Sequence, residues 1–337
     1  MRVSTLIIAS GCVTALACDS GSKKTSGAPP DSDPGTPPDS GSSSADPPTV
    51  VSISPPDQAI GVTSDATIVI TFSTEMDRAA TQAAFQSPDL PPCSSVLTWN
   101  AAGTVLTVTP NQPLAYATGS DPGSVTAKRY SILVSTAAVD LSGHHLASTY
   151  ASSFRTKRKI QQVIATEVVD LTGSVVSDGG VLGDGFDLGV GDTFHDGVAK
   201  GVITFDITAL PSGVHLESAT LKLFLEDVLN APIPALGPLI VDHVTFAHRL
   251  DAFDAVARLS FGSMPISRND DSGFKTIDVL AGVVDDLANR DSLGNLSQYR
   301  LATTVPTDHN GSPAGYSFAD AVAFSNSPEL DVEYSID

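Results

Sequence analysis

The sequence predicts an all-β fold: two tandem β-sandwich domains, the second with one short helix, after a disordered tether. Three observations predict it. Short runs rich in Val, Ile and Thr recur along residues 49–337, and 27 Gly and 23 Pro residues punctuate the chain. Apolar and polar residues alternate with a period of two in several of these runs, as in residues 67–72. Residues 19–48, in contrast, consist almost entirely of Ser, Pro, Gly and Asp.

Composition limits the classes of partner. The chain has 38 acidic and 18 basic residues, a formal net charge of −20. Binding to nucleic acid or to anionic lipid needs surfaces rich in Lys and Arg, so we expect neither as a partner. Three cysteines are too few for a disulfide-stapled scaffold, and no apolar run reaches the length of about 20 residues that a spanning helix needs.

Residues 1–17 have the composition of a bacterial export signal. Arg2 supplies a positive start, and residues 3–16 form a mostly apolar segment too short to span a bilayer. Ala17 directly before Cys18 resembles the lipobox of bacterial lipoproteins, although Ala15 stands where that box usually has Leu. The resemblance implies cleavage after residue 17, a palmitate-type acyl anchor on Cys18, and attachment to the cell envelope at the outer membrane or cell surface. Cys12 is a second candidate, and an ordinary secretory signal is the alternative.

Residues 18–48 then join the anchor to the folded part. Of residues 19–48, 24 are Ser, Pro, Gly or Asp and seven are Pro. Such a segment cannot bury enough apolar surface to offset the entropy lost on ordering. We therefore expect a disordered tether that holds the folded domains away from the membrane.

Residues 49–157 are predicted to form the first domain. Its expected strands are residues 49–54, 67–72, 96–99, 104–109, 130–135 and 150–156. Residues 100–103 end in Gly103 and form a four-residue hairpin loop between two of these strands. Short strands at this spacing over about 110 residues predict an Ig-like sandwich, in which Trp99 is expected to be a core residue.

Five short segments give this domain a family resemblance. It resembles the SbsA-type bacterial Ig-like domain of surface-layer and secreted proteins, apart from His144, where that family usually has Asn. The resemblance implies a spacer or adhesive unit rather than an enzyme. The matching segments are PTVVS (48–52), PDQAIGV (56–62), ITFSTEMD (70–77), WNAAGT (99–104) and DLSG (140–143).

Residues 158–337 are predicted to form a larger, jelly-roll-like sandwich. Its one helix has an apolar face that includes Val279, Val283 and Leu287, with Asp285 and Asp286 on the opposite face. The basic residues 157–159 are expected to be a solvated linker. The expected strands are residues 163–169, 201–206, 219–225, 239–246, 298–302, 321–324 and 330–335.

The second domain resembles the DNRLRE-type β-sandwich of secreted proteins. Some members of that family look like carbohydrate-binding modules of polysaccharide-degrading enzymes. Residues 158–337 contain no Trp, which weakens that implication, and exposed tyrosines such as Tyr299 or Tyr316 on one face would favour it. The matching segments are LGVG (188–191), GVITFD (201–206), LPSG (210–213), SATLKL (218–223), IDV (277–279) and PELDVEY (328–334).

Known catalytic motifs are absent from the sequence. Ser272 and Lys275 have Ser-x-x-Lys spacing but lack the other partners of that chemistry. His243 and His248 offer no obvious third zinc ligand, and the neighbouring His144 and His145 are expected to face opposite ways. Cys93 is expected to have no partner once Cys12 is cleaved off and Cys18 is lipidated.

An Asp- and Gly-rich segment is the strongest chemical signal. Asp178, Asp184, Asp187 and Asp192 lie among six glycines within residues 178–192. Hard cations such as calcium prefer several oxygen ligands on a tight, glycine-permitted loop. The four aspartates are therefore calcium candidates, and a solvated acidic loop without a cation is the alternative.

Together these observations predict a lipid-anchored surface protein with a non-enzymatic structural, adhesion or display role. A glycan or another cell-surface protein is the expected partner. One alternative is carbohydrate binding by the second domain. The other is an enzyme with an unrecognised carboxylate site, which would need two facing carboxylates in a cleft.

Overall fold

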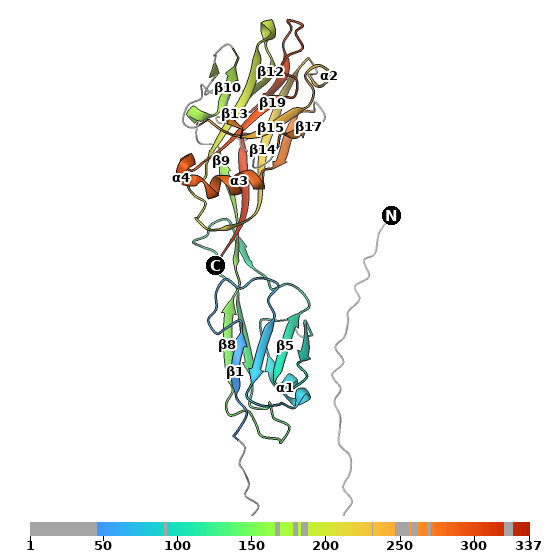
Figure 1. Cartoon of the computed structure of the whole chain (residues 1–337), viewed down its shortest axis with the longest axis vertical. Helices are drawn as coiled ribbons and strands as arrows, with labels where there is room; N and C mark the ends of the chain where they lie inside the picture. The colour runs from blue at the N-terminus through green and yellow to red at the C-terminus, as the bar shows by residue number, and fades with distance from the viewer. Residues whose placement is uncertain are drawn as a thin grey trace, which may run out of the picture. The chain divides into compact units, whose positions relative to one another are not determined.

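The computed structural model describes residues 46–90, 93–165, 169–177, 181–182, 188–230, 232–246, 256–257, 262–267, 271–319 and 326–337 (Figure 1). The chain divides into two compact units, each described below by itself. Unit 1 holds the described residues up to Ala59, with Asp65–Leu114 and Arg129–Phe154. Unit 2 holds Ile60–Ser64, Ala115–Lys128 and the described residues of Arg155–Asp337. Among the described residues, no helix has the length and apolarity needed to cross a membrane.

Unit 1 contains two β-sheets, as the Ig-like prediction requires. The hairpin loop at residues 100–103 is confirmed: Asn100 Oδ1 accepts hydrogen bonds from the backbone of Thr104 and Val105, and Gly103 has a φ of 64°. The first sheet has the order β1-β2-β5-β4, formed by β1 (Val50–Ser54), β2 (Ile68–Phe72), β5 (Val105–Pro110) and β4 (Ser95–Trp99). The second has the order β3-β7-β8, formed by β3 (Phe85–Gln86), β7 (Arg129–Val134) and β8 (Tyr150–Arg155).

Alternation along these strands builds the core of unit 1. In β2, Ile68, Ile70 and Phe72 are buried while the residues between them are partly exposed. The second sheet contributes Tyr130 and Phe154, whose rings stack with centroids 5.6 Å apart. Trp99 stacks on Phe72 at 5.9 Å but is only partly buried, so it lies at the margin of the core rather than within it.

Unit 1 also contains a helix that the strand pattern did not predict, α1 (Arg78–Ala84). Asp77 caps it, accepting a hydrogen bond from the backbone N–H of Ala80 at 2.9 Å. An Asp cap before an Ala-rich run is a recognisable helix start. The signal was therefore present in the sequence, in a helix of only seven residues.

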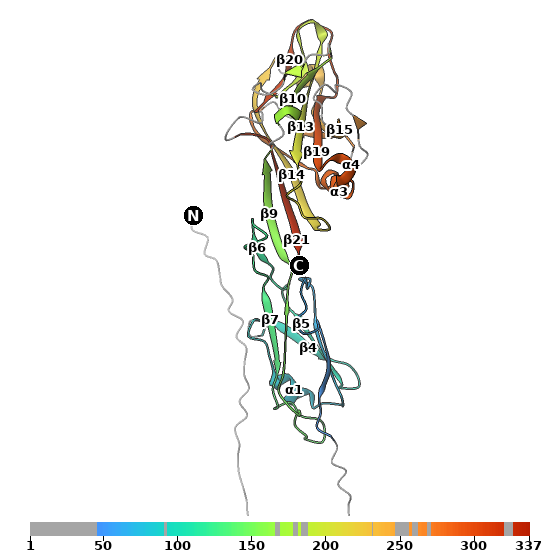
Figure 2. The ribbon, with the colours of Figure 1, turned by 90° about the vertical axis from the view of Figure 1, so that its left-hand side faces the viewer.

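Unit 2 is built on one large sheet whose described strand pairs are antiparallel, except for β6 with β9 (Figure 2). Along the sheet the order is β16 (Val256–Ala257), β15 (Leu239–Thr245), β19 (Leu296–Thr303), β13 (Val198–Asp206), β12 (Leu188–Asp192), β20 (Ala314–Phe318), β14 (His215–Leu229), β21 (Glu329–Ile336), β9 (Arg158–Ala165) and β6 (Ala117–Gly119). Four more strands attach beside this path. β10 (Gly173–Val176) pairs with β13 and β11 (Val181–Leu182) pairs with β10, while β17 (Met264–Ser267) pairs with β15 and β18 (Gly273–Asp278) with β14.

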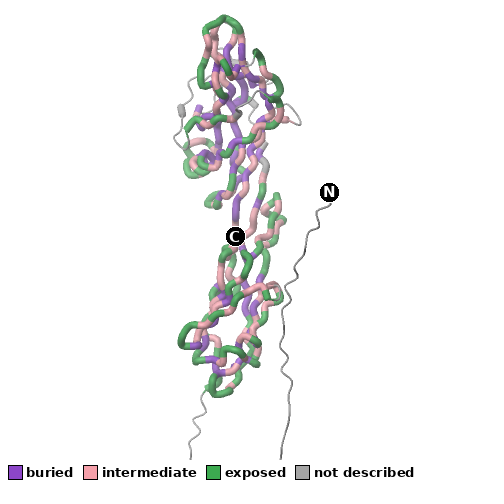
Figure 3. The backbone as a smooth tube through the Cα atoms, turned by 90° about the vertical axis from the view of Figure 1, so that its right-hand side faces the viewer, coloured by how far each residue is buried: buried purple, intermediate pink, exposed green. Residues whose placement is uncertain are grey.

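The sheet of unit 2 encloses one large buried core, and a smaller buried cluster lies apart from it. Val241 on β15 and Leu330 on β21, from strands far apart in the strand order, belong to the same buried cluster. The sheet must therefore curve around that core. Figure 3 shows buried backbone positions running along the central strands of this unit. The all-β fold class is confirmed.

Helices of unit 2 lie between its strands. The predicted helix is confirmed as α3 (Leu280–Ala288), with Val283 fully buried. The sequence predicted one helix in this domain, and that number is too low, because α2 (Ile233–Leu236) and α4 (Arg290–Leu293) are also present. Short 3₁₀ turns, η1 (Val169–Leu171) and η2 (Phe194–Asp196), lie within the N-terminal half of the unit.

Two local expectations are wrong. The basic residues 157–159 are not a solvated linker, because Arg158 begins β9 and Lys159 Nζ contacts Glu217 and Glu333 at 2.7 and 2.6 Å. The segment ending at Asp192 is not wholly a loop, because Leu188–Asp192 is the mostly buried strand β12. The strand predicted at residues 321–324 lies outside the described residues.

Candidate functional site

A cavity of about 380 Å³ in unit 2 is the clearest candidate site. Its floor comes from the paired strands β12 and β20, where Gly191 and Gly315 allow close approach of the two backbones. Phe194, 71% exposed, and Leu229, 49% exposed, stand at its margin. A mostly apolar cavity of this size with a few polar groups is typical of small-ligand sites.

Asp192, the last residue of β12, lines this cavity. Its side chain is only 4% exposed. Oδ2 accepts a hydrogen bond from Thr307 Oγ1 at 2.6 Å and from the backbone N–H of Asp308 at 3.2 Å. Oδ1 is buried and has no hydrogen-bond partner. A buried carboxylate oxygen without a partner is energetically costly.

Two further carboxylates converge on Asp192. Asp196, at the end of η2, and Asp308, in the loop between β19 and β20, each place an oxygen so that all three residues' oxygens lie within 4.8 Å of one another. Pairing of Asp192 with Ala314 brings the end of β12 beside the start of β20. The β12–β13 turn and the loop before β20 therefore meet at one edge of the sheet.

The predicted calcium set is only partly visible. Asp178, Asp184 and Asp187 lie outside the described residues, whereas Asp192 lies at the candidate site. Its described neighbours in the carboxylate group are Asp196 and Asp308, which the sequence pattern did not select. Asp308 is 116 positions from Asp192, so no local spacing rule could have joined them.

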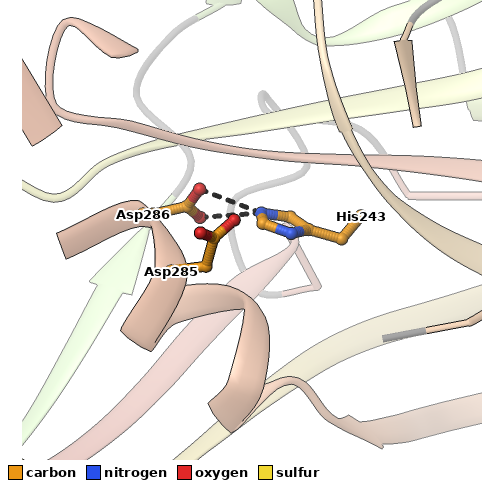
Figure 4. A group of neighbouring side chains, drawn as sticks. All are labelled: His243, Asp285 and Asp286. Atoms are coloured by element: carbon orange, nitrogen blue, oxygen red, sulfur yellow. Dashed lines mark hydrogen bonds and ion pairs between the residues drawn. The ribbon is translucent and has the colours of Figure 1, made fainter. Parts of the chain in front are cut away.

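A second polar group lies in the interior of unit 2 (Figure 4). His243 Nε2, on β15, lies 2.9 Å from Oδ1 and 3.0 Å from Oδ2 of Asp286, on α3, and both side chains are almost fully buried. Asp285 places a carboxylate oxygen within 4.8 Å of this pair. The expectation that Asp286 belongs to a solvated helix face is therefore wrong. His248 lies outside the described residues.

Both tyrosines considered for sugar stacking are buried. Tyr299 is 0% exposed, and its hydroxyl is bonded to Ser297 Oγ at 2.9 Å. Burial, reinforced by the negative charge of Asp286, raises the pKa of the Tyr299 hydroxyl above its ordinary range. Tyr316 is 3% exposed and lines the cavity beside Asp192. Neither residue offers the exposed ring that would have favoured the carbohydrate alternative.

Unit 1 has a cavity of its own, of about 670 Å³. Its polar lining groups bond one another: Asp57 Oδ1 accepts from the backbone N–H of Ser153 at 2.8 Å, and Arg129 donates to Ser153 Oγ at 3.0 Å. The bond from the Ser153 backbone is the main reason why the pKa of Asp57 is lowered. These contacts tie the segment before residue 60 to β8.

The remaining singled-out residues have structural contacts. His144 Nδ1 lies 2.9 Å from Asp140 Oδ2, whereas His145 Nδ1 lies 2.8 Å from the carbonyl oxygen of Thr136, so the two rings bind different groups as expected. Burial opposes ionisation of Asp140, but hydrogen bonds from His144 and Ser142 outweigh it and lower its pKa.

The structure describes Cys93, Ser272 and Lys275 among the cysteine and serine candidates. Cys93 is disulfide-bonded in the full chain, and no other cysteine is among the described residues. The expectation that Cys93 has no partner concerns the chain after cleavage and lipidation, and it stays a prediction. Cys18 and Cys12 lie outside the described residues. Ser272 is exposed before β18, and Lys275 lies on that strand.

Comparison with known proteins supplies a domain family for one part of the chain. No curated protein matches the chain. The N-terminal part of the bacterial S-layer protein SbsC is similar at 14% identity and a TM-score of 0.23, over 47% of this chain and 40% of that one. This chain therefore spans less than half of that structure's length.

Two other solved structures show similarly distant likeness. An L,D-transpeptidase from Mycobacterium smegmatis is 15% identical, with a TM-score of 0.24 over 69% of this chain and 74% of that one. SGBP-B from a complex xyloglucan utilization locus in Bacteroides uniformis is 7% identical, with a TM-score of 0.22 over 84% and 72%. Residues 44–156 match the bacterial Ig-like domain family, and this part of the chain is therefore a bacterial Ig-like domain, the kind of domain that indicates a cell-surface or extracellular bacterial protein.

Proposed function

We propose that this chain is a lipid-anchored protein of the bacterial cell surface that acts by contact rather than by catalysis. The observation that carries the proposal is the order of segments: an export signal ending at Ala17, Cys18, a 30-residue polar tether and then a bacterial Ig-like domain. A tether of this length spans roughly 30 Å, enough to hold the folded units clear of a membrane surface.

Unit 2 supplies the surface that contacts a partner in this proposal. The exposed side chains of Phe194 and Leu229 stand beside the cavity. Exposed apolar groups around a concavity favour an interaction site over a plain solvated surface. Another cell-surface protein or a glycan is the expected partner.

Metabolic labelling tests the anchor. Cells that express the full chain and are fed radiolabelled palmitate should incorporate label into this protein, and Cys18→Ala should abolish the label. Cys12→Ala and Cys93→Ser are matched controls, since each removes one other cysteine and should leave the label intact. Label that survives Cys18→Ala contradicts the proposed anchor, and loss in Cys12→Ala instead would move the site.

Carbohydrate binding is the second candidate, and the exposed Phe194 beside a cavity of about 380 Å³ favours it. The resemblance of residues 158–337 to the DNRLRE-type sandwich also supports this role. Because the unit is rich in carboxylates, a neutral saccharide is expected rather than an acidic one.

A glycan array probed with the full chain tests this candidate. Binding of a neutral saccharide that is lost in Phe194→Ala would support it. Phe274→Ala is the matched control, because Phe274 is 55% exposed on β18 and does not line the cavity. An array without a hit, or a hit unaffected by Phe194→Ala, would leave protein contact as the role of unit 2.

A further inference from the structure

We propose that Asp192, Asp196 and Asp308 form a binding site for a calcium-type divalent cation at the edge of the unit 2 cavity. One oxygen of each carboxylate lies within 4.8 Å of the others. Calcium ligands surround the ion at 2.3–2.6 Å, so oxygens bound to one calcium ion lie at most about 5 Å apart. The spacing of the three oxygens therefore suits a shared cation.

Among the side chains that the structure describes, no basic group balances the charge of these three carboxylates. Asp192, Asp196 and Asp308 accept hydrogen bonds only from neutral donors: Thr307 and backbone N–H groups, and the Asn310 amide. No Lys, Arg or His whose side chain the structure describes forms an ion pair with them. Like charges held this close are unfavourable unless protons or a cation neutralise them. Residues 158–337 hold 26 acidic and 10 basic residues, so the net charge of this part of the chain does not offset the repulsion among the three carboxylates.

The buried oxygen of Asp192 is the independent indication of a ligand. The side chain is only 4% exposed, and Oδ1 has no hydrogen-bond partner. Buried polar atoms in folded proteins are nearly always satisfied, so an orphaned carboxylate oxygen on a member of a carboxylate group points to an ion. A bound divalent cation supplies both the missing contact and the missing positive charge.

The two turns that carry the other aspartates are already joined. Asp196 Oδ1 accepts from the backbone N–H of Gly311 at 2.8 Å, and Asp308 Oδ1 accepts from the backbone N–H of Asn310 at 3.1 Å. Asp196 has a φ of 60°, a conformation that Asp adopts more readily than most residues. An irregular site of carboxylates on turns suits calcium, which accepts flexible geometry, better than magnesium, which demands a regular octahedron.

The position of the site beside the cavity has a consequence for binding. Asp192 lines the cavity, so a cation held there would present any open coordination position close to a ligand in it. Three carboxylates leave part of the six to eight oxygen positions of calcium to water or to a ligand. The cation site does not depend on the lipid anchor, so either proposal can fail without the other.

Calorimetric titration of the full chain with calcium chloride, at fixed ionic strength, tests the site. The expected result is saturable binding of one ion per chain.

A thermal melt provides the second measurement. In calcium at 100 times the dissociation constant, the unfolding midpoint of unit 2 should rise by about 5–10 °C relative to chelator. The sole Trp, Trp99, lies in unit 1, so its emission should report an unshifted transition for that unit.

Asp196→Asn combined with Asp308→Asn removes two ligands and keeps the side-chain shapes. This variant should lose the calcium-dependent shift, and in chelator it should unfold at the same or a higher temperature than the wild type because repulsion is relieved. That second readout separates loss of a cation site from simple misfolding. The control Asp121→Asn with Asp291→Asn makes the same charge change at exposed positions of unit 2 and should behave as the wild type. A wild-type chain with no saturable heat and no shift, or a double variant that keeps both, would overturn the proposal.

Discussion

His243 on β15 and Asp286 on α3 form a buried contact that connects the sheet of unit 2 to this helix (Figure 4). His243 Nε2 lies 2.9 and 3.0 Å from the two carboxylate oxygens of Asp286. Each residue is about 1% exposed, so water cannot replace a lost partner. The ring of His243 also lies 5.6 Å from that of Tyr299 on the neighbouring strand β19. The pair thus holds α3 against β15 and β19 in one position.

Truncation of either member of this pair should be strongly destabilising. His243→Ala and Asp286→Ala should each lower the free energy of unfolding of unit 2 by about 3–5 kcal/mol, since each leaves a buried polar partner behind. Urea unfolding followed by circular dichroism measures this. His215→Ala, at an exposed position on β14, is the control. The double variant should cost less than the sum of the two singles, and single costs below about 1 kcal/mol would show that the pair is not a buried link.

The Lys159–Glu333 contact predicts a pH dependence on the acid side. The hydrogen bond from Lys159 is the main reason why the pKa of Glu333 is lowered, and the bonds to Glu217 and then Glu333 raise the pKa of Lys159 above its ordinary range. A lowered carboxyl pKa stabilises the fold above the unfolded value of about 4.3 and loses that contribution as pH falls through the folded value. The raised pKa of Lys159 acts in the opposite sense, and its contribution is lost only in strong base.

Glu333→Gln should therefore flatten the loss of unit 2 stability as the pH falls below the unfolded carboxyl value of about 4.3, because the lowered Glu333 pKa makes that loss begin there. The effect should be no more than about 1 kcal/mol, because the pair is partly exposed and screened by solvent. Thermal melts across this range provide the measurement. Asp291→Asn, which removes an exposed carboxylate on α4, should leave the slope unchanged. Equal slopes in the wild type and Glu333→Gln would contradict the prediction.

Gly191 and Gly189 lie on the same strand but should respond differently to a methyl group. A Cβ at Gly191 would lie 2.4 Å from the carbonyl oxygen of Ala314, and the backbone φ there is 136°. Gly191→Ala should destabilise unit 2 by about 1–3 kcal/mol because β12 and β20 cannot stay as close. At Gly189 the nearest atom would be Ser174 Oγ at 3.6 Å, an ordinary contact, so Gly189→Ala should be tolerated. Equal midpoints for the two variants in a thermal melt would refute this account of the cavity floor.

Because Trp99 is the sole Trp and stacks on Phe72, its fluorescence reports the folding of unit 1 separately from that of unit 2. Phe72 is 3% exposed, so Phe72→Ala should lower the stability of unit 1 by about 3–5 kcal/mol and shift Trp99 emission to longer wavelength. Phe274→Ala, on an exposed ring in unit 2, is the control and should leave Trp99 emission unchanged. Unaltered emission in Phe72→Ala would mean that the ring of Trp99 is not held against Phe72.

Most of the strands could be predicted from local pattern. Alternation in β2 and the Gly103 hairpin between β4 and β5 depend on neighbours within a few residues, and the structure has both. The helix α3 was visible from the spacing of its apolar residues. The strands that the pattern missed, such as β12, β18 and β20, contain Gly or charged residues, and pairing with strands distant in the sequence places them in a sheet.

The sequence by itself determined the all-β class, the Ig-like character of the first domain and the acidic balance, because composition and short-range periodicity carry that information. Only the tertiary structure decided which polar side chains meet. Asp192 and Asp308 are brought together by the pairing of β12 with β20, and His243 and Asp286 by the packing of α3 on the sheet. Both relationships join residues more than 40 positions apart, and strand order in a sheet, rather than any local spacing, sets such distances.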